Sequence, residues 1–276
     1  MRDAILKRES TRTFKNEALT KAEIDLILTL VKKHENYVGP FDHSFEFTFS
    51  LNNSSDSNGK KIGTYGFLRN VPSFIGGVCQ NDFLSIVDFG FVFEHLILDL
   101  TSHDFDTCWL GGTFKRQNYR KELEENEIIP AISPVGHRAI NRTFLEKATR
   151  SLAKSQSRLP LSHLFKNYSD FSNVILDLDN PVIHSLSLVR KAPSASNKQP
   201  WRAYVDENIV HFYIERTAKY PRVSLKYDIQ ALDMGIALCH FEMGINHFNK
   251  KATYFKEKEP KEIPNNEYVI SVKVSK

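Results

Sequence analysis

The chain of 276 residues has few cysteines and no long apolar run. Cys79, Cys108 and Cys239 are far apart and form no Cys-x-x-Cys pair, which argues against a disulfide scaffold and a structural zinc site. No run approaches the roughly 18 apolar residues that a membrane-spanning helix needs, and the first residues lack the apolar core of a signal peptide. We therefore expect a protein of the reducing cytoplasm.

Several catalytic signatures are missing as well. The sequence has no Gly-x-Ser-x-Gly elbow, no Walker loop and no Gly-x-Gly-x-x-Gly motif. The net charge of +4 is spread over interspersed acidic and basic residues, which is too mild to indicate nucleic-acid binding. His95 and His240 have no third ligand at a suitable spacing, so we interpret them as hydrogen-bonded core residues and expect no metal site. A hydrophobic content of 41% with 20 Phe is ample for a sizeable core.

Three pairs of segments match each other in the same order along the chain. Asp88–Leu96 and Asp233–Phe241 share Asp, Gly and His at identical spacing. Leu28–Lys33 resembles Leu186–Lys191, and the segment from Asn126 (NEIIPAISPV) resembles the segment from Asn266 (NEYVISVKV). Any two apolar helices look somewhat alike, but the shared order and spacing favour an internal duplication.

Two short motifs differ between the copies. Arg8, Ser10 and Arg12 alternate, so in an extended arm they share one side, and two guanidiniums with a hydroxyl suit a phosphate. The second motif, Ala192–Trp201, reads APSASNKQPW. Taken singly, the first motif is better interpreted as a basic N-terminal arm and the second as a loop bounded by prolines.

The two motifs are distributed over the copies in a complementary way. After Lys33 the first copy reads HENYVGP, where the second copy has the loop APSASNKQP. At the level of the arm, the second copy reads NYSDFS from Asn167. The first copy therefore keeps only the arm, and the second copy keeps only the loop.

Both motifs resemble those of the FMN-dependent nitroreductases. Members of that family are homodimers with each FMN at the subunit interface, where one subunit supplies the arm and the other the loop. Here both motifs stand in one chain, too far apart for one subunit, as in the fused branch called putative TM nitroreductases. The resemblance implies an α+β, nitroreductase-like fold in which two half-repeats form an intramolecular pseudo-dimer. It implies one FMN pocket, and a monomer is possible because the dimer is internal.

The resemblance also implies roles for individual residues. Arg8 and Ser10 would bind the FMN phosphate, and Arg12 would lie near N1 and O2 of the flavin, where a fixed cation raises the reduction potential. Arg158 matches a Ser-Arg-Leu-Pro segment whose arginine meets the phosphate, although a surface arginine is an equal alternative. The flavin ring would be approached by the backbone of one loop and covered by another: Trp109, Leu110, Gly111 and Gly112, and Pro193, Ser194, Ala195 and Asn197.

Glycine at 111 and 112 would let the backbone come close, with an amide pointing at N5, although a helix C-cap glycine is the alternative reading. The implied activity is that of an FMN-dependent NAD(P)H oxidoreductase of nitroreductase type. NAD(P)H would give hydride to flavin N5, which then passes to a nitroaromatic or quinone-type acceptor without a catalytic side chain. The alternative is a catalytically degenerate flavin-binding or scaffold protein.

Local patterns predict most of the secondary structure. Thr20 and Glu23 form a capping box that opens a helix, and Asn180 with Pro181 opens another that should reach Lys191. The two apolar helices that contain Asp88 and Asp233 should pack against each other. Strands are expected at 45–51, 73–78, 128–135 and 269–274, a hairpin at 201–214, and a helix near 143–154. We expect halves at 1–137 and 166–276, joined by a crossover at 138–165.

Overall fold

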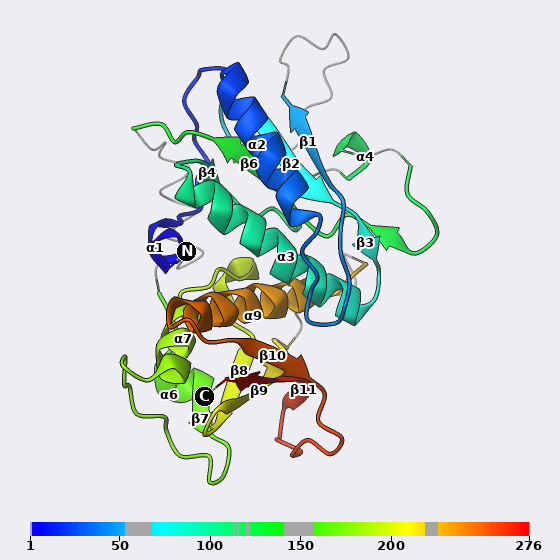
Figure 1. Ribbon diagram of the computed structural model, residues 1–276. Helices are drawn as coiled ribbons and strands as arrows, with labels where there is room; N and C mark the ends of the chain where they lie inside the picture. The colour runs from blue at the N-terminus through cyan, green and yellow to red at the C-terminus, as the bar shows by residue number, and fades with distance from the viewer. Residues whose placement is uncertain are drawn as a thin grey trace.

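The computed structural model describes residues 2–52, 68–112, 114, 116–119, 122–140, 157–218 and 226–275. The helix predicted near 143–154 lies outside these residues. The described chain forms two halves, each with its own sheet, and the long helices α3 and α9 lie between the two sheets (Figure 1). This is the α+β, nitroreductase-like arrangement expected from the sequence. The exact half boundaries at 137/138 and 165/166 stay predictions.

The first half contains a four-stranded antiparallel sheet in the order β1-β2-β6-β4. A two-stranded sheet of β3 and β5 stands beside it. The described elements of this half are α1 (Arg2–Lys7), α2 (Lys21–His34), β1 (Phe47–Leu51), β2 (Ser73–Gly77), β3 (Cys79–Gln80), α3 (Phe83–Ser102), β4 (Asp106–Thr107), α4 (Arg116–Tyr119), β5 (Glu127–Ile128) and β6 (Ile132–Gly136).

The second half contains a five-stranded sheet in the order β10-β11-β9-β8-β7, antiparallel except for the parallel pair β7 and β8. The predicted hairpin is confirmed as β8 and β9. The described elements are α6 (Leu161–Leu164), β7 (Phe165–Asn167), α7 (Pro181–Val189), the 3-10 turn η1 (Ala195–Asn197), β8 (Trp201–Asp206), β9 (Ile209–Glu215), α9 (Ile229–His247), β10 (Ala252–Phe255) and β11 (Asn266–Val274).

Two repeat-related glycines lie where α3 crosses α9. A Cβ atom at Gly90 would overlap the carbonyl oxygen of Leu232, and one at Gly235 would overlap that of Val87. Only residues without a side chain allow the two backbones to come this close. One apolar core therefore runs through both halves, as the all-round apolar character of both helices predicts.

Asp88 and Asp233, the repeated aspartates, each accept hydrogen bonds from the loop that follows a helix of their own half. Asp88 accepts from the amides of Phe41 and His43 at 3.0 and 3.1 Å, which fixes the loop after α2. Asp233 accepts from the amide of Ala195 at 2.8 Å, which fixes the loop after α7. Burial is the main reason why the pKa of both carboxyl groups is raised. The shared role supports an internal duplication, because matching residues hold matching loops.

Two sequence predictions differ from the structure. The strand predicted at 128–135 is divided between β5 and β6, which belong to different sheets. Pro130 lies in the break and has no N–H to give to a ladder, while its carbonyl accepts from the Tyr227 hydroxyl at 2.8 Å. The helix that begins at Pro181 ends at Val189 instead of Lys191, and the amide of Arg190 still bonds to Leu186.

The predicted capping box at the start of α2 is confirmed. The amide of Thr20 donates to Glu23 at 2.7 Å, the amide of Glu23 donates to the Thr20 hydroxyl at 3.3 Å, and His137 contacts the same carboxylate at 2.7 Å. The Thr20 amide and hydroxyl, with His137, lower the pKa of Glu23 to about 2. A lowered acid pKa stabilises the fold above the unfolded pKa of 4.5, and this contribution is lost as the pH falls towards 2.

Glu23→Gln should therefore flatten the fall in thermal midpoint between about pH 4.5 and pH 2. At pH 6 the variant should lose about 1 kcal/mol of unfolding free energy, the usual size of an N-terminal cap. The measurement is thermal unfolding by circular dichroism at several pH values. Glu17→Gln, at an exposed position before the helix, is the control and should follow the wild-type profile. An unchanged slope in Glu23→Gln would contradict the assignment.

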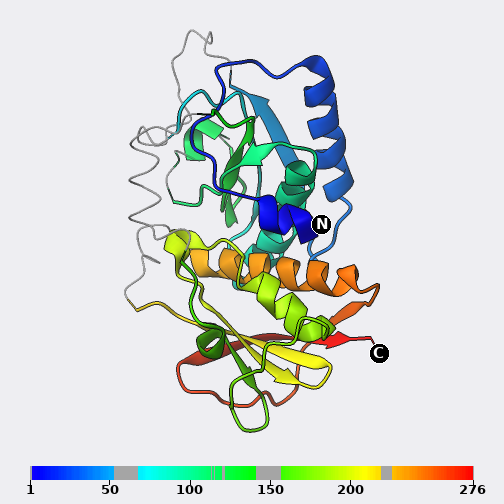
Figure 2. The ribbon, with the colours of Figure 1, turned by 90° about the vertical axis from the view of Figure 1, so that its left-hand side faces the viewer.

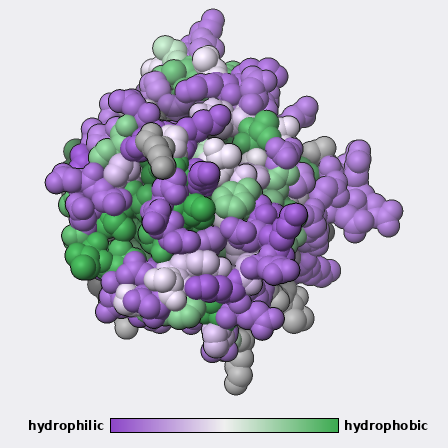
Figure 3. Space-filling model, turned by 60° about the horizontal axis from the view of Figure 1, so that its bottom comes forward, coloured by the Kyte–Doolittle hydropathy of each residue, from purple (hydrophilic) through white to green (hydrophobic). Residues whose placement is uncertain are grey.

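The second half exposes an apolar segment after β7. Ile175, Leu176 and Leu178 are 83%, 54% and 52% exposed. In Figure 3, which brings this half forward, apolar side chains gather at the left of a mostly polar face.

None of the described helices is long and apolar enough to cross a membrane.

Candidate functional site at the junction of the halves

The arm leaves α1 and runs along the first half as an extended segment (Figure 2). Ser10 forms a parallel bridge with Thr107, and the amide of Thr11 donates to the Thr107 carbonyl at 2.9 Å. Thr11 and Thr13 are buried. Because alternate residues of an extended segment face opposite sides, Ser10 and Arg12 face away from this buried row, as the sequence predicts.

Both arginines of the arm have a buried nitrogen without a described hydrogen-bond partner. The Nη1 atoms of Arg8 and Arg12 are buried and have no hydrogen-bond partner within the part of the chain that the structure describes. The Arg8 side chain is only 7% exposed, and its Nε lies 3.9 Å from the Glu94 carboxylate. A buried guanidinium nitrogen without an acceptor is costly, so it marks the place where an acceptor of the ligand fits.

The second half brings Arg158 and the predicted loop together. Arg158 Nη1 donates to Asn197 Oδ1 at 3.2 Å, and its Nη2 donates to the Lys191 carbonyl at 3.1 Å. The neighbouring Arg190 donates to the Leu159 carbonyl at 2.7 Å. The alternative that Arg158 is an ordinary surface arginine is therefore disfavoured, because its guanidinium donates hydrogen bonds to Asn197 and Lys191.

Three guanidinium groups from the two halves gather here. Burial lowers the pKa of Arg158, and the positive charges of Arg8 and Arg190 lower it further. Arg8 belongs to the arm of the first half, whereas Arg158 and Arg190 lie beside α7 of the second half. Like charges in one place are unfavourable until an anion joins them, so the cluster suits a phosphate.

The loop from Pro193 to Asn197 lies beside α9 at the junction (Figure 2). Ser196 and Asn197 have positive φ angles of 49° and 56°. The Ala195 amide is already engaged by Asp233, and the Ser194 hydroxyl accepts from the Gln199 amide at 2.9 Å. A hydroxyl that accepts can still donate, so this contact leaves the donor capacity of Ser194 unused.

The segment Trp109–Gly112 reaches the other half. Leu110 pairs with Ile132, and the Gly111 carbonyl accepts from Arg116 at 2.7 Å and from the Tyr227 hydroxyl at 3.0 Å. A Cβ atom on Gly111 would lie 2.8 Å from Cδ1 of Ile229. Gly112 is exposed. The C-cap reading of these glycines is wrong, because α3 ends at Ser102 and His103 caps it.

Sequence reasoning missed two residues at this junction. Glu94 is a buried acid that contacts both Arg8 and Trp109, and Arg190 adds the third guanidinium. Glu94 is one of three acids, with Asp88 and Asp99, in the largely apolar sequence of α3, and an acid in such a helix was the signal for it. Arg190 gave no such signal, because basic residues are common at helix ends.

Of the repeated histidines, His240 is a hydrogen-bonded core residue, as expected, whereas His95 is buried but its Nε2 makes no hydrogen bond among the described residues. His240 contacts Glu94 at 2.9 Å and the Leu188 carbonyl at 3.1 Å, and His95 Nε2 lies 3.5 Å from Glu242. No group of metal-ligating side chains suited to an ion occurs among the described residues. A separate hollow of about 250 Å³ lies between α2, α3 and α9, and Tyr37, His95 and His247 are among its lining residues.

Fold and site together define an α+β protein of the nitroreductase type with guanidinium groups from both halves at its internal junction. The chain belongs to the family described as "Putative TM nitroreductase", whose model matches residues 1–245. No curated protein matches the chain.

Solved structures of nitroreductases resemble the chain at different lengths. A structure described as a putative nitroreductase from Thermotoga maritima is 20% identical and has a TM-score of 0.59, covering 98% of this chain and 92% of that chain. One described as an oxidoreductase containing FMN is 16% identical, with a TM-score of 0.44, and covers 52% and 82%. A putative NADH dehydrogenase/NAD(P)H nitroreductase from Bacteroides thetaiotaomicron is 21% identical, with a TM-score of 0.40, and covers 51% and 88%.

Proposed function

We propose that the chain is an FMN-dependent oxidoreductase that takes reducing equivalents from NAD(P)H and gives them to a nitroaromatic or quinone-type acceptor. The observation that carries the proposal is the guanidinium cluster of Arg8, Arg158 and Arg190, drawn from both halves and containing a buried nitrogen with no protein acceptor among the described residues. Membership of the nitroreductase family supports an oxidoreductase activity. A single site built from residues of both halves supports one FMN for each chain.

The arm carries two buried Nη1 atoms without a described acceptor, one on Arg8 and one on Arg12. A ligand with a phosphate at one end and hydrogen-bond acceptors at the other could satisfy both, and FMN has this form. Arg8 and Arg158 would hold its phosphate, and Arg12 would lie beside the ring.

The remaining predicted residues would hold the ring from both sides. Ser194 and Asn197 would cover it from the second half, and the backbone of Gly111 and Gly112 would approach it from the first. When bound, FMN would supply the hydride chemistry, and the protein would position it and tune its potential through Arg12. No side chain is needed as a general acid or base in this proposal.

The test uses purified full-length protein incubated with excess FMN and then desalted. We expect a retained flavin absorbance band, and loss of that band on anaerobic addition of NADH or NADPH in a stopped-flow instrument. A colourless protein after desalting would overturn the proposal of FMN binding. Bound FMN that neither nucleotide reduces would instead identify a flavin-binding protein without this activity.

A further inference from the structure

One fully buried carboxylate connects the pieces of the proposed flavin site. Glu94 lies on α3 with no exposed side-chain surface, and it accepts from Trp109 Nε1 at 2.6 Å. Its other oxygen contacts His240 Nε2 at 2.9 Å and lies 3.9 Å from Arg8 Nε. These three partners come from the loop after β4, from α9 of the second half and from the arm.

The hydrogen bonds of His240 fix the number of protons in this cluster. Its Nδ1 faces the Leu188 carbonyl at 3.1 Å, and because a carbonyl only accepts, Nδ1 carries a proton. The contact between Nε2 and the carboxylate oxygen also needs a proton, on one atom or the other. Glu94 and His240 thus share one proton between the two halves, and both are fully buried.

The repeat shows that this cluster is particular to one side of the junction. His95 and His240 occupy matching positions, and each faces a glutamate of the other half. Glu94, however, matches Cys239 in the second copy, and a cysteine cannot replace its carboxylate. The carboxylate is therefore present on the side where the arm lies.

We infer that Glu94 is a positioning residue for the flavin site, acting through Arg8 and Trp109. This inference rests on the proposed function. The carboxylate forms an ion pair with Arg8, 3.9 Å from its Nε, while Arg8 Nη1 has no acceptor among the described residues, and it holds the Trp109 loop through the indole N–H. A site whose side chains are already fixed by a buried charge-assisted network loses less conformational entropy when it binds its ligand.

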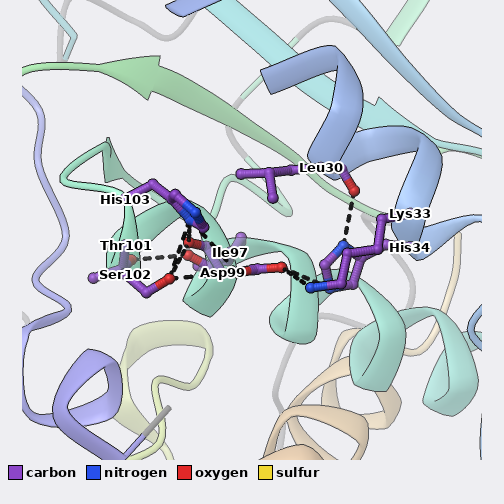
Figure 4. Close-up of polar contacts among 8 residues, drawn as sticks. All are labelled: Leu30, Lys33, His34, Ile97, Asp99, Thr101, Ser102 and His103. Carbon is purple, nitrogen blue, oxygen red and sulfur yellow. Dashed lines mark hydrogen bonds and ion pairs between the residues drawn. The ribbon is translucent and has the colours of Figure 1, made fainter. Parts of the chain in front are cut away.

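Glu94→Gln removes the negative charge of the side chain while keeping its hydrogen bonds to Trp109 and His240. A glutamine amide can accept from Trp109 with its oxygen and donate to His240 Nε2 with its nitrogen, so the variant should fold. Its NH2 group then faces the Arg8 guanidinium, where a carboxylate oxygen stood. The matched control is Asp99→Asn: Asp99 is a buried acid on the same helix, paired with Lys33 at 2.7 Å and lying between His34 and His103, away from the arm (Figure 4).

The first measurement needs no flavin. In a nitrogen–proton correlation spectrum of the apo protein, the two tryptophan indole signals are assigned with Trp109→Phe. Glu94→Gln should move the Trp109 signal and leave that of Trp201, which is held elsewhere in the core, while Asp99→Asn should move neither. An unmoved Trp109 signal would overturn the contact on which the inference depends.

The second measurement is an FMN titration of wild type, Glu94→Gln, Arg8→Ala and the double variant. We expect Glu94→Gln to weaken FMN binding about 10-fold in the wild-type background and about 3-fold in the Arg8→Ala background, because the part of its effect that passes through Arg8 is lost and the part through Trp109 remains. Asp99→Asn should change the affinity less than 2-fold. Should Glu94→Gln not fold, Glu94→Asp in the same cycle replaces it, with a smaller loss because the charge remains.

The possible failures are distinguishable. A folded Glu94→Gln that binds FMN as tightly as wild type, or more tightly, overturns the inference alone. The same is true of an equal loss in both backgrounds. A wild-type protein that binds no FMN overturns the proposed function and the inference together.

Discussion

Arg12→Ala should weaken FMN binding by about 10- to 150-fold, the range expected for loss of a charged hydrogen bond of about 1.5–3 kcal/mol. Arg12 Nη1 is buried without a partner among the described residues, so a bound ligand would supply its acceptor. Loss of the cation should also lower the flavin reduction potential by some tens of millivolts, because the reduced ring carries negative charge. Fluorescence titration with FMN and spectroelectrochemistry measure the two effects.

Three further variants control this result. Lys15→Ala removes an exposed cation of the same arm and should leave both quantities unchanged. Asn197→Ala, in the other half, should weaken FMN about 5-fold through loss of a neutral hydrogen bond and its hold on Arg158. Tyr37→Ala, in the loop of the first copy that lacks the Pro-Ser motif, should have little effect. Equal losses from Arg12, Asn197 and Tyr37 would contradict a single mixed pocket.

Gly235→Ala should unfold the protein or cost at least 3 kcal/mol, the upper range for overpacking a core. In an ordinary helix this change stabilises by about 1 kcal/mol. Here the new Cβ would overlap the backbone of Val87 and Gly90 on α3, and backbone cannot move aside as a flexible side chain can. The measurement is urea unfolding followed by circular dichroism.

Ala237→Gly on the same helix is the control for that prediction. It removes a buried methyl group and helix propensity without adding atoms, so it should cost about 1–2 kcal/mol. A Gly235→Ala protein as stable as wild type would show that the two halves do not meet at this crossing.

The sequence predicted the features that depend on local chemistry or on the repeat. Thr20 with Glu23, and Asn180 with Pro181, identify two helix starts because each satisfies free amides with its own side chains. The crossing of α3 and α9 followed from their all-round apolar character. The break at Pro130 could have been predicted, because a proline has no N–H for a ladder, but the contact of its carbonyl with Tyr227, a partner distant in sequence, could not.

The site was only partly predictable for the same reason. Arg8, Arg158 and Asn197 were identified through motifs, and the structure brings them to one junction. Glu94 and Arg190 belong to no motif, and their importance depends on which residues the fold places beside them. That the Trp109 indole is engaged by Glu94, and the Ala195 amide by Asp233, is likewise a property of tertiary packing.

The most direct test of a single flavin site shared by two unequal halves is the stoichiometry of FMN binding by isothermal titration calorimetry. The account predicts one FMN for each chain. Two FMN for each chain would contradict a single mixed site, and no binding would contradict the flavin site itself.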